Sequence, residues 1–485
     1  MRAAPSWVVF LRLGGIVCAA CIPLPISLFA QASRLSQAVR QYVSVDAPVV
    51  ALTGVTVIDG TGAAPLGRAT VILRDGRIAA VGDSAAIAIP AGADVHHLPG
   101  HTVLPGFVMV HEHMFYPAGG GVYSQLSYSF PRLYLAGGAT TIRTGGSMSG
   151  YADINLARAI EEGRVPGPRI DVTAPYLNGP GLPIQQVKAL RDPADARRMV
   201  EYWAEEGATS FKAYMQISRE ELRASVEAAH ARGLKVTGHL CSVTYREAAD
   251  IGIDNLEHGF LASTDFVPDK EPDACPGGNA GQQALMAMDP SGPEMQGLIR
   301  HLIERNVAIT STLTVFETFT PNRTPIAAGA LEAMLPETRI QYLRTRANIA
   351  DSDQSPWPDV FSRAMQLEKA FADAGGLLIA GTDPTGYGGV VAGFANQRAI
   401  ELLVEAGFTP VEAIRVGTLN GARYLERDEA IGSLAVGKVA DLLVVQGAPE
   451  TRIEDIRNVR IVFKDGVGYD PERLRDDSRG RVGLH

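Results

Sequence analysis

The sequence is poor in cysteine, with four residues in a chain of 485. Two of them, Cys18 and Cys21, lie close to the N-terminus. The remaining pair, Cys241 and Cys275, forms either one disulfide or two buried thiols. So few cysteines exclude a small scaffold built on disulfides. Hydrophobic residues make up 46% of the chain and charged residues 20%, so the fold is expected to rest on a large apolar core.

A basic surface is also missing. The formal net charge is −9, and no segment forms a run or stripe of lysine and arginine. Binding to a phosphate backbone needs such a surface, so nucleic acid is not an expected partner.

The N-terminal residues differ in composition from the rest of the chain. Residues 14–30 carry no charge, and the run ends at a small-x-small pattern, Ala-Gln-Ala. This pattern predicts a secretory signal at 1–32 that is cleaved after Ala32, and hence an exported protein, periplasmic or secreted, without a membrane span once mature. A membrane anchor is the alternative, but Pro23 and Pro25 interrupt the apolar run.

The pattern of strands and helices predicts two domains of α/β type. Short β-branched runs separated by turn residues occupy 49–82 and return at 440–463. Between them, strand-like runs alternate with helical periodicity. We therefore predict a (β/α)8 TIM-type barrel at 104–427, with a small β-sandwich domain built from both ends of the mature chain, 33–103 plus 428–485.

Two segments, 263–293 and 320–358, are predicted to be insertions after barrel strands. Their position favours lids over the mouth of the barrel. The first is rich in proline, glycine and aspartate, so disorder is its alternative.

The pair His111 and His113 directly follows the strand-like run 103–110. Residues i and i+2 of a strand point to the same side, so both imidazoles are expected to project together. Barrel active sites lie at the carboxyl ends of the strands, which is where this pair is predicted to be.

Four more polar residues occupy the predicted ends of other strands: Lys212, His239, His258 and Asp383. Each has an ordinary explanation by itself, as a snorkelling lysine, a core histidine or a helix cap. Together with the histidine pair, they place six such residues at five strand ends. That combination favours one metal site.

These motifs resemble the amidohydrolase superfamily, and within it the imidazolonepropionase-like and prolidase-like branch, which includes Xaa-Pro dipeptidases. The resemblance rests on five phrases: Leu104-Pro105-Gly106 with His111-x-His113, the strand lysine Lys212, Val236-Thr237-Gly238-His239, Asp254-x-x-Glu257-His258-Gly259, and Gly381-Thr382-Asp383.

The resemblance implies two divalent metal ions, with zinc expected. His111 and His113 would bind the first ion together with Asp383, and His239 and His258 the second. Lys212, carboxylated by CO2, would bridge both. A hydroxide shared by the ions would attack the substrate, with Asp383 as catalytic base.

The lysine also bears on the reaction. In the superfamily resembled, members with a bridging lysine hold two metal ions and catalyse hydrolysis. The deaminase-like members hold one metal ion and lack this lysine. We therefore expect hydrolysis of an amide or peptide bond in a small molecule, such as a dipeptide or N-acyl amino acid. A lactonase or a phosphotriesterase-type esterase is the alternative, and a non-catalytic binding relative is a third possibility.

Four residues near predicted strand ends are candidate substrate contacts: Tyr116, Arg143, Tyr176 and Tyr214. Arg143 or a tyrosine would hold a substrate carboxylate or steady an oxyanion. Packing in the core or at the rim is equally compatible with each tyrosine. A homo-oligomer is possible, and the sequence does not decide it.

Overall fold

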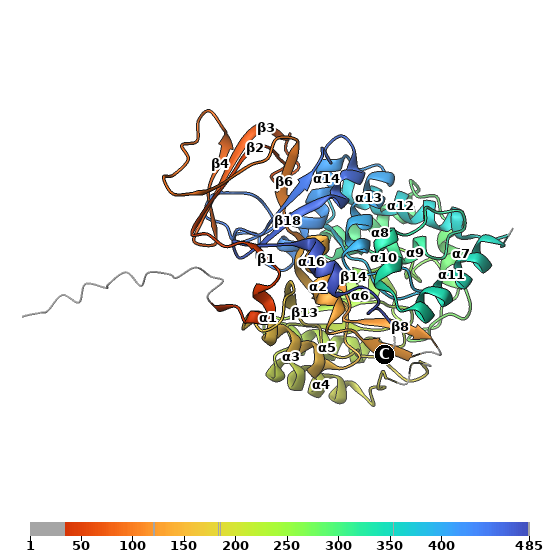
Figure 1. The fold of residues 1–485 in the computed structure, drawn as a ribbon. Helices are drawn as coiled ribbons and strands as arrows, with labels where there is room; N and C mark the ends of the chain where they lie inside the picture. The colour runs from red at the N-terminus through yellow and green to blue at the C-terminus, as the bar shows by residue number, and fades with distance from the viewer. Residues whose placement is uncertain (1–33, 120–121, 183, 185, 353, 484–485) are drawn as a thin grey trace, which may run out of the picture.

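The computed structural model describes residues 34–119, 122–182, 184, 186–352 and 354–483 (Figure 1). The predicted signal at 1–32 lies outside these residues. Within the described ranges, no helix is both long enough and apolar enough to cross a membrane.

Strands from both ends of the described chain pair in one nine-stranded sheet. Its order is β1-β19-β18-β17-β6-β2-β3-β4, with β5 paired to β2. The junction is the antiparallel pair β6 and β17, and Figure 1 shows the blue C-terminal strands beside the orange N-terminal ones. The second layer that a sandwich requires remains a prediction. The strands are β1 (Val43–Val45), β2 (Val49–Val57), β3 (Leu66–Arg74), β4 (Arg77–Asp83), β5 (Asp94–His97), β6 (His101–Pro105), β17 (Leu442–Gln446), β18 (Val459–Lys464) and β19 (Val467–Tyr469).

Two Asp-Gly turns reverse the chain direction between neighbouring strands of this sheet. Asp75 and Gly76 join β3 to β4, and Asp465 and Gly466 join β18 to β19. All four residues have a positive φ, between 49° and 80°. Two-residue hairpins that need left-handed backbone at both positions favour this dipeptide.

Outside this sheet, the chain forms parallel strands in two groups. A three-stranded sheet has the order β11-β10-β7, and a five-stranded sheet has the order β12-β13-β14-β15-β16. A parallel bridge between Thr173 and Ser210 links β11 to β12, and the backbone N–H of Thr382 donates to the carbonyl of His111 beside β7. A short hairpin, β8 and β9, follows β7. These strands are β7 (Phe107–Glu112), β8 (Phe115–Gly119), β9 (Val122–Gln125), β10 (Ala139–Thr144), β11 (Arg169–Asp171), β12 (Ser210–Ala213), β13 (Lys235–Gly238), β14 (Asn255–Glu257), β15 (Ala308–Ser311) and β16 (Leu378–Ala380).

Helices connect and cover the parallel strands (Figure 1). Their starts follow local sequence: α5 begins at a capping box in which the Ser218 and Glu221 side chains bond to each other's backbone. The helices are α1 (Gln37–Arg40), α2 (Ser129–Gly137), α3 (Gly150–Glu161), α4 (Pro193–Glu206), α5 (Arg219–His230), α6 (Tyr245–Ile251), α7 (Ala280–Ala287), α8 (Pro293–Glu304), α9 (Leu313–Glu317), α10 (Ala328–Ala333), α11 (Pro336–Ala350), α12 (Trp357–Asp373), α13 (Phe394–Glu405), α14 (Pro410–Arg415), η2 (Val416–Asn420), α15 (Gly421–Tyr424), η3 (Ile453–Arg457) and α16 (Pro471–Asp477).

Both predicted insertions contain helices. Segment 263–293 holds α7, and segment 320–358 holds α10 and α11 and leads into α12. Cys241, just after β13, forms a disulfide with Cys275 of the first insertion. The open question about these two cysteines is thereby answered in favour of pairing.

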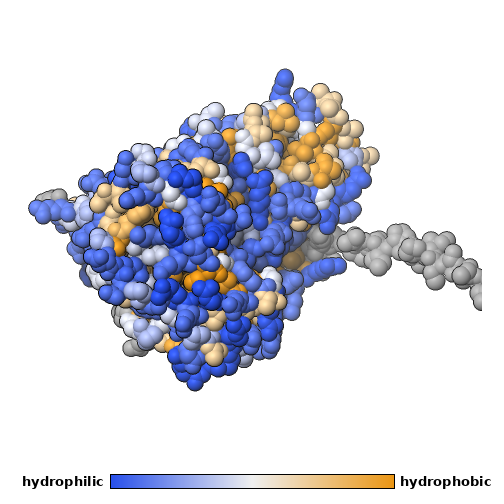
Figure 2. All heavy atoms as spheres, turned by 180° about the vertical axis from the view of Figure 1, so that it is seen from behind, coloured by the Kyte–Doolittle hydropathy of each residue, from blue (hydrophilic) through white to orange (hydrophobic). Residues whose placement is uncertain are grey.

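The face in Figure 2 is mostly hydrophilic, with one apolar area over the nine-stranded sheet and others over the rest of the molecule. Leu66, Ile89 and Val95 of the sheet region are 39%, 46% and 49% exposed. Nothing in the single chain tests a homo-oligomer.

Candidate active site

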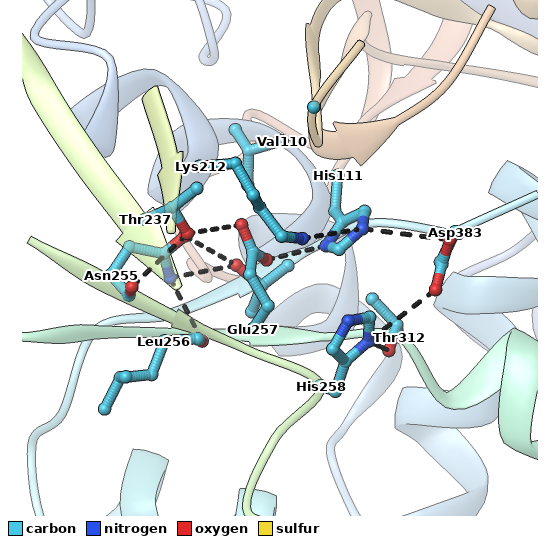
Figure 3. Close-up of polar contacts among 12 residues, drawn as sticks. Val110, His111, Lys212, Thr237, Asn255, Leu256, Glu257, His258, Thr312 and Asp383 are labelled. Atoms are coloured by element: carbon cyan, nitrogen blue, oxygen red, sulfur yellow. Dashed lines mark hydrogen bonds and ion pairs between the residues drawn. The ribbon is translucent and has the colours of Figure 1, made fainter. Parts of the chain in front are cut away.

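The six predicted metal ligands gather in one place. The Nε2 atom of His113 lies 3.2 Å from Asp383 Oδ1, and His258 Nδ1 lies 3.7 Å from Asp383 Oδ2. Lys212 Nζ is 3.4 Å from His111 Nε2, and the rings of His239 and His258 are 4.3 Å apart between centroids. Figure 3 shows Lys212, His111, His258 and Asp383 turned toward one another from different strands. We call these six residues the floor residues.

Strand ends position them. His111 lies near the end of β7 and Lys212 in β12. His113, His239 and His258 directly follow strands, and Asp383 lies three residues after β16. His258 and Asp383 have φ values of 69° and 51°, a left-handed backbone that side chains with a Cβ rarely adopt. Such local strain persists where the surroundings enforce it, and it is concentrated at functional sites.

Hydrogen bonds to Nδ1 fix the orientation of the His111 and His113 rings. His111 Nδ1 donates to Glu257 Oε2 at 2.7 Å, and His113 Nδ1 donates to the carbonyl of Gly146 at 3.1 Å. With Nδ1 occupied in each ring, the Nε2 lone pair is free to bind a metal ion.

Burial sets the charges of the floor residues. It lowers the pKa of His111 to about 4 and that of His239 to about 3, so both imidazoles are neutral at neutral pH. Burial also lowers the pKa of Lys212 to about 8. It would raise the pKa of Asp383, but the surrounding histidines hold that pKa well below its usual range. Neutral imidazoles around a carboxylate and a lysine that loses its proton easily are a donor set that fits divalent metal ions.

His111, His258 and Asp383 form a group that could hold a metal ion. Their candidate ligand atoms lie within 4.8 Å of one another, and all three residues are buried. This places a metal-binding group at the carboxyl ends of the parallel strands, as the sequence predicts.

A buried carboxylate beneath the floor was missed as a functional residue. Glu257 is fully buried, and besides His111 it accepts hydrogen bonds from Arg143 at 2.6 Å and from Thr237 (Figure 3). Burial would raise the pKa of Glu257, but His111 and Arg143 hold it well below its usual range. The signal in the sequence was a charged residue inside a short strand, one position before a ligand histidine. Glu257 therefore fixes the orientation of His111.

Glu112, between the first two histidines, faces away from the floor. Its carboxyl accepts a hydrogen bond from Asn396 Nδ2 at 2.9 Å and another from Thr382. Burial raises the pKa of Glu112 to about 8, so the group is neutral at pH 7.

A cavity of about 260 Å³ opens above the floor residues. Tyr176 and Tyr214, two of the predicted substrate contacts, line it. Each insertion contributes as well, with Gln282 from α7 and Trp357 at the start of α12.

The other two predicted substrate contacts do not reach this cavity. Arg143 is 1% exposed, and its guanidinium donates to Glu257, Asn255, the Tyr424 hydroxyl and the carbonyl of Val110. Its donors are used inside the protein, so the expected contact with a substrate carboxylate is corrected to a structural role. The Tyr116 hydroxyl accepts a hydrogen bond from the backbone of Gly389 and lines a neighbouring hollow instead.

Comparison with known proteins identifies the family. Residues 102–468 match the model of the amidohydrolase family, which is more than half of the chain. The chain belongs to the amidohydrolase family, and the resemblance predicted from the motifs is confirmed.

Individual relatives agree with this assignment. A Bifidobacterium longum protein provisionally named a prolidase has a structure that superposes with a TM-score of 0.64 at 26% identity, over 89% of this chain and 98% of that one. A Xaa-Pro dipeptidase with bound methionine superposes with a TM-score of 0.65 at 20% identity, over 87% and 100%. At that identity the second likeness shows the fold alone, and the fold is of the amidohydrolase type.

Curated relatives match over shorter stretches. Imidazolonepropionase of Nocardia farcinica is 38% identical over 124 residues, which are 24% of this chain and 31% of that enzyme. Adenine deaminases also match, and the chain spans less than a fifth of their length. Family and relatives together support the predicted class of enzyme, a hydrolase acting on C–N bonds.

Proposed function

We propose that the protein hydrolyses an amide bond of a small molecule at two metal ions held by the six floor residues. The observation that carries the proposal is the meeting of these side chains, from five strands, at the bottom of one cavity. A pair of divalent ions, when bound, supplies Lewis-acid polarisation of a carbonyl and a nucleophile derived from water at neutral pH.

Four histidines and one aspartate divide between the two ions in this proposal. His111 and His113 hold one ion with Asp383, and His239 and His258 hold the other. Burial lowers the pKa of His111, His239 and His258, so these imidazoles are neutral, as metal ligands must be. We expect zinc, because imidazole and carboxylate oxygen suit it.

Lys212 is proposed to bridge the ions as a carbamate. Its amine is 1% exposed and has a lowered pKa, so a useful fraction is unprotonated near pH 8. A neutral amine adds to CO2 with release of a proton and becomes an anion with two oxygens, one for each ion. The same site holds an unmodified lysine less favourably, since a cation would face two dications.

Asp383 is proposed to bind one ion through one carboxylate oxygen and to move protons with the other. Thr385 donates to Asp383 Oδ1 at 2.8 Å and fixes the orientation of the carboxylate. Tyr176 and Tyr214 line the cavity, and their hydroxyls are proposed to donate to a substrate oxygen as negative charge develops on it.

The remaining finer assignments are part of the same proposal. The two parallel sheets, eight strands in total, are proposed to form the (β/α)8 barrel of 104–427. The nine-stranded sheet is proposed to be the β-sandwich domain of 33–103 plus 428–485. Export after cleavage at Ala32 stays a proposal that N-terminal sequencing of the mature protein tests.

A substrate panel tests the proposed reaction. Zinc-loaded protein is given dipeptides, N-acyl amino acids, other amides, lactones and phosphotriesters, and release of each product is followed. Turnover of amides supports the proposal, and its loss in Asp383→Asn assigns it to this site. Turnover only of lactones or phosphotriesters moves the protein to the alternative class. No turnover of any compound by metal-loaded protein leaves a binding protein.

A further inference from the structure

The walls of the cavity carry no charge above the floor residues. The wall residues are Phe115, Tyr123, Met148, Tyr176, Ile184, Tyr214, Leu261, Ala262, Gln282, Val315, Phe316, Phe319, Trp357, Val360, Thr385 and Gly386. None of these described residues is an arginine, lysine or acid. A charged group on a substrate would therefore lie against apolar and neutral polar side chains.

Arg143, the arginine that the sequence suggested for a substrate carboxylate, is bonded to Glu257 below the floor residues. It therefore cannot bind a carboxylate in the cavity. The five internal positions outside the described ranges are Gly120, Gly121, Pro183, Gln185 and Asp353, so none of them has a cationic side chain. A free carboxylate held against this wall, away from the floor residues, would leave water without a cationic partner, which is unfavourable.

Aromatic rings form two parts of the wall. On one part, Phe316 and Phe319 pack on Trp357, with centroid distances of 6.1 and 4.7 Å. On the other part, Phe115 stacks on His113 at 4.2 Å, and Tyr214 lies 4.8 Å from Tyr176. A wall with this many aromatic rings favours contact with an aromatic or large apolar group of a ligand.

The polar side chains of the wall are neutral. Gln282 Nε2 is buried without a hydrogen-bond partner among the described residues. A buried donor without a partner costs free energy, so it marks a place where a ligand oxygen is expected. An amide carbonyl or an ether oxygen satisfies such a donor without bringing a charge into the cavity.

We propose that the substrate is an uncharged amide with an aromatic or large apolar substituent, and that amides with a free carboxylate are poor substrates. This inference rests on the proposed function, because it names the substrate class of the same cavity. It departs from the dipeptide or N-acyl amino acid type that the sequence suggests.

Two matched amides test the inference. N-acetylphenethylamine and N-acetylphenylalanine have the same ring and the same scissile bond, and they differ by one carboxylate. With zinc-loaded protein, we expect kcat/KM to be at least about tenfold higher for the uncharged amide, a difference of about 1.4 kcal/mol. Equal or higher kcat/KM for N-acetylphenylalanine overturns the inference.

Three variants locate the preference in the wall. Trp357→Leu should lower kcat/KM for the uncharged aromatic amide about tenfold, whereas Tyr202→Leu, which alters a 43% exposed aromatic residue of α4 outside the cavity, should leave it unchanged. Gln282→Lys should shift the ratio toward N-acetylphenylalanine by placing a cation in the wall. An unchanged kcat/KM for the uncharged amide in Trp357→Leu, or an unchanged ratio in Gln282→Lys, contradicts the inference.

Binding of both amides, followed by calorimetry on the same zinc-loaded protein, separates the two proposals. If neither amide is hydrolysed but the uncharged one binds in a Trp357-dependent manner, the inference holds and the proposed hydrolysis fails. If neither amide binds, or if both bind equally well, the inference fails whatever the outcome of the substrate panel.

Discussion

Replacing Glu257 with glutamine removes one buried negative charge and keeps the shape of the side chain. The carboxylate is fully buried and bonded to His111 and Arg143, which are each 1% exposed. Breaking a buried ion pair from one side leaves the other charge uncompensated, which costs about 3–5 kcal/mol. The glutamine also loses the strong acceptor that orients the His111 ring, and loss of such a partner lowers metal affinity about 10- to 100-fold.

Two measurements follow these effects separately. Zinc affinity is measured by competition with a chromophoric chelator, and the free energy of unfolding of the metal-free protein by urea titration. The direction of the pH dependence of stability follows from the pKa of Glu257, which is lower in the folded protein than in the unfolded chain. The stabilisation by Glu257 is present above the unfolded pKa of 4.5, and it is lost as the pH falls through the folded pKa. The stability gap between Glu257→Gln and the wild type should therefore narrow in acid.

Glu112→Gln is the matched control. Glu112 is equally buried and lies next to His111, but its raised pKa of about 8 keeps it neutral at pH 7. A glutamine there replaces a neutral group by a neutral group, so zinc affinity should change little. The reasoning is refuted if Glu257→Gln binds zinc within about twofold of the wild type and unfolds at the same urea concentration.

Further changes test other parts of the structure. Lys212→Ala should lose the metal pair, and elemental analysis showing full metal content would remove the carbamate bridge from the proposal. Asp383→Asn should lower turnover at least about a hundredfold, the scale of general acid–base catalysis, as checked by steady-state kinetics on the best amide. Cys275→Ser opens a disulfide with a sequence separation of 34. It should lower stability by roughly 3–4 kcal/mol and loosen α7, so KM rises while zinc content stays constant. Burial raises the pKa of Glu368 in α12 to about 8, from 4.5, so the wild type should lose stability between those values as pH rises, by at most about 1.4 kcal/mol per pH unit. In Glu368→Gln that slope should disappear, and urea titrations from pH 5 to 9 that keep it would place the titration elsewhere.

The floor residues could be predicted from the sequence because each stands out from the residues next to it in the chain. A polar residue that ends an apolar strand is visible in the chain, and parallel strands bring their carboxyl ends to one edge. The same rule named four candidate substrate contacts, of which Tyr176 and Tyr214 line the cavity and Tyr116 and Arg143 do not. Local order also predicted pairing of strands from both ends of the chain, since their turn signals and β-branched runs are alike.

Arg143 and Glu257 show where local order is insufficient. They are 114 positions apart, on β10 and β14, and only the three-dimensional arrangement shows that each is the other's partner. A strand arginine near a metal site is equally compatible with binding a substrate or a buried carboxylate. The choice depends on which side of the floor its guanidinium lies, and the sequence contains no signal for that.

The distribution of charge across the floor has a consequence for specificity. The charged groups near the metal site lie at or below the floor, where each is nearly fully buried. Arg143 and Glu257 pair with each other there, and Lys212 is one of the floor residues. The walls above contain only neutral groups. Charges that stabilise the metal site are thus separated from the surface that selects the substrate. Changes in the wall should therefore alter substrate preference without loss of metal, and changes beneath the floor should weaken metal binding without altering the preference between the two matched amides.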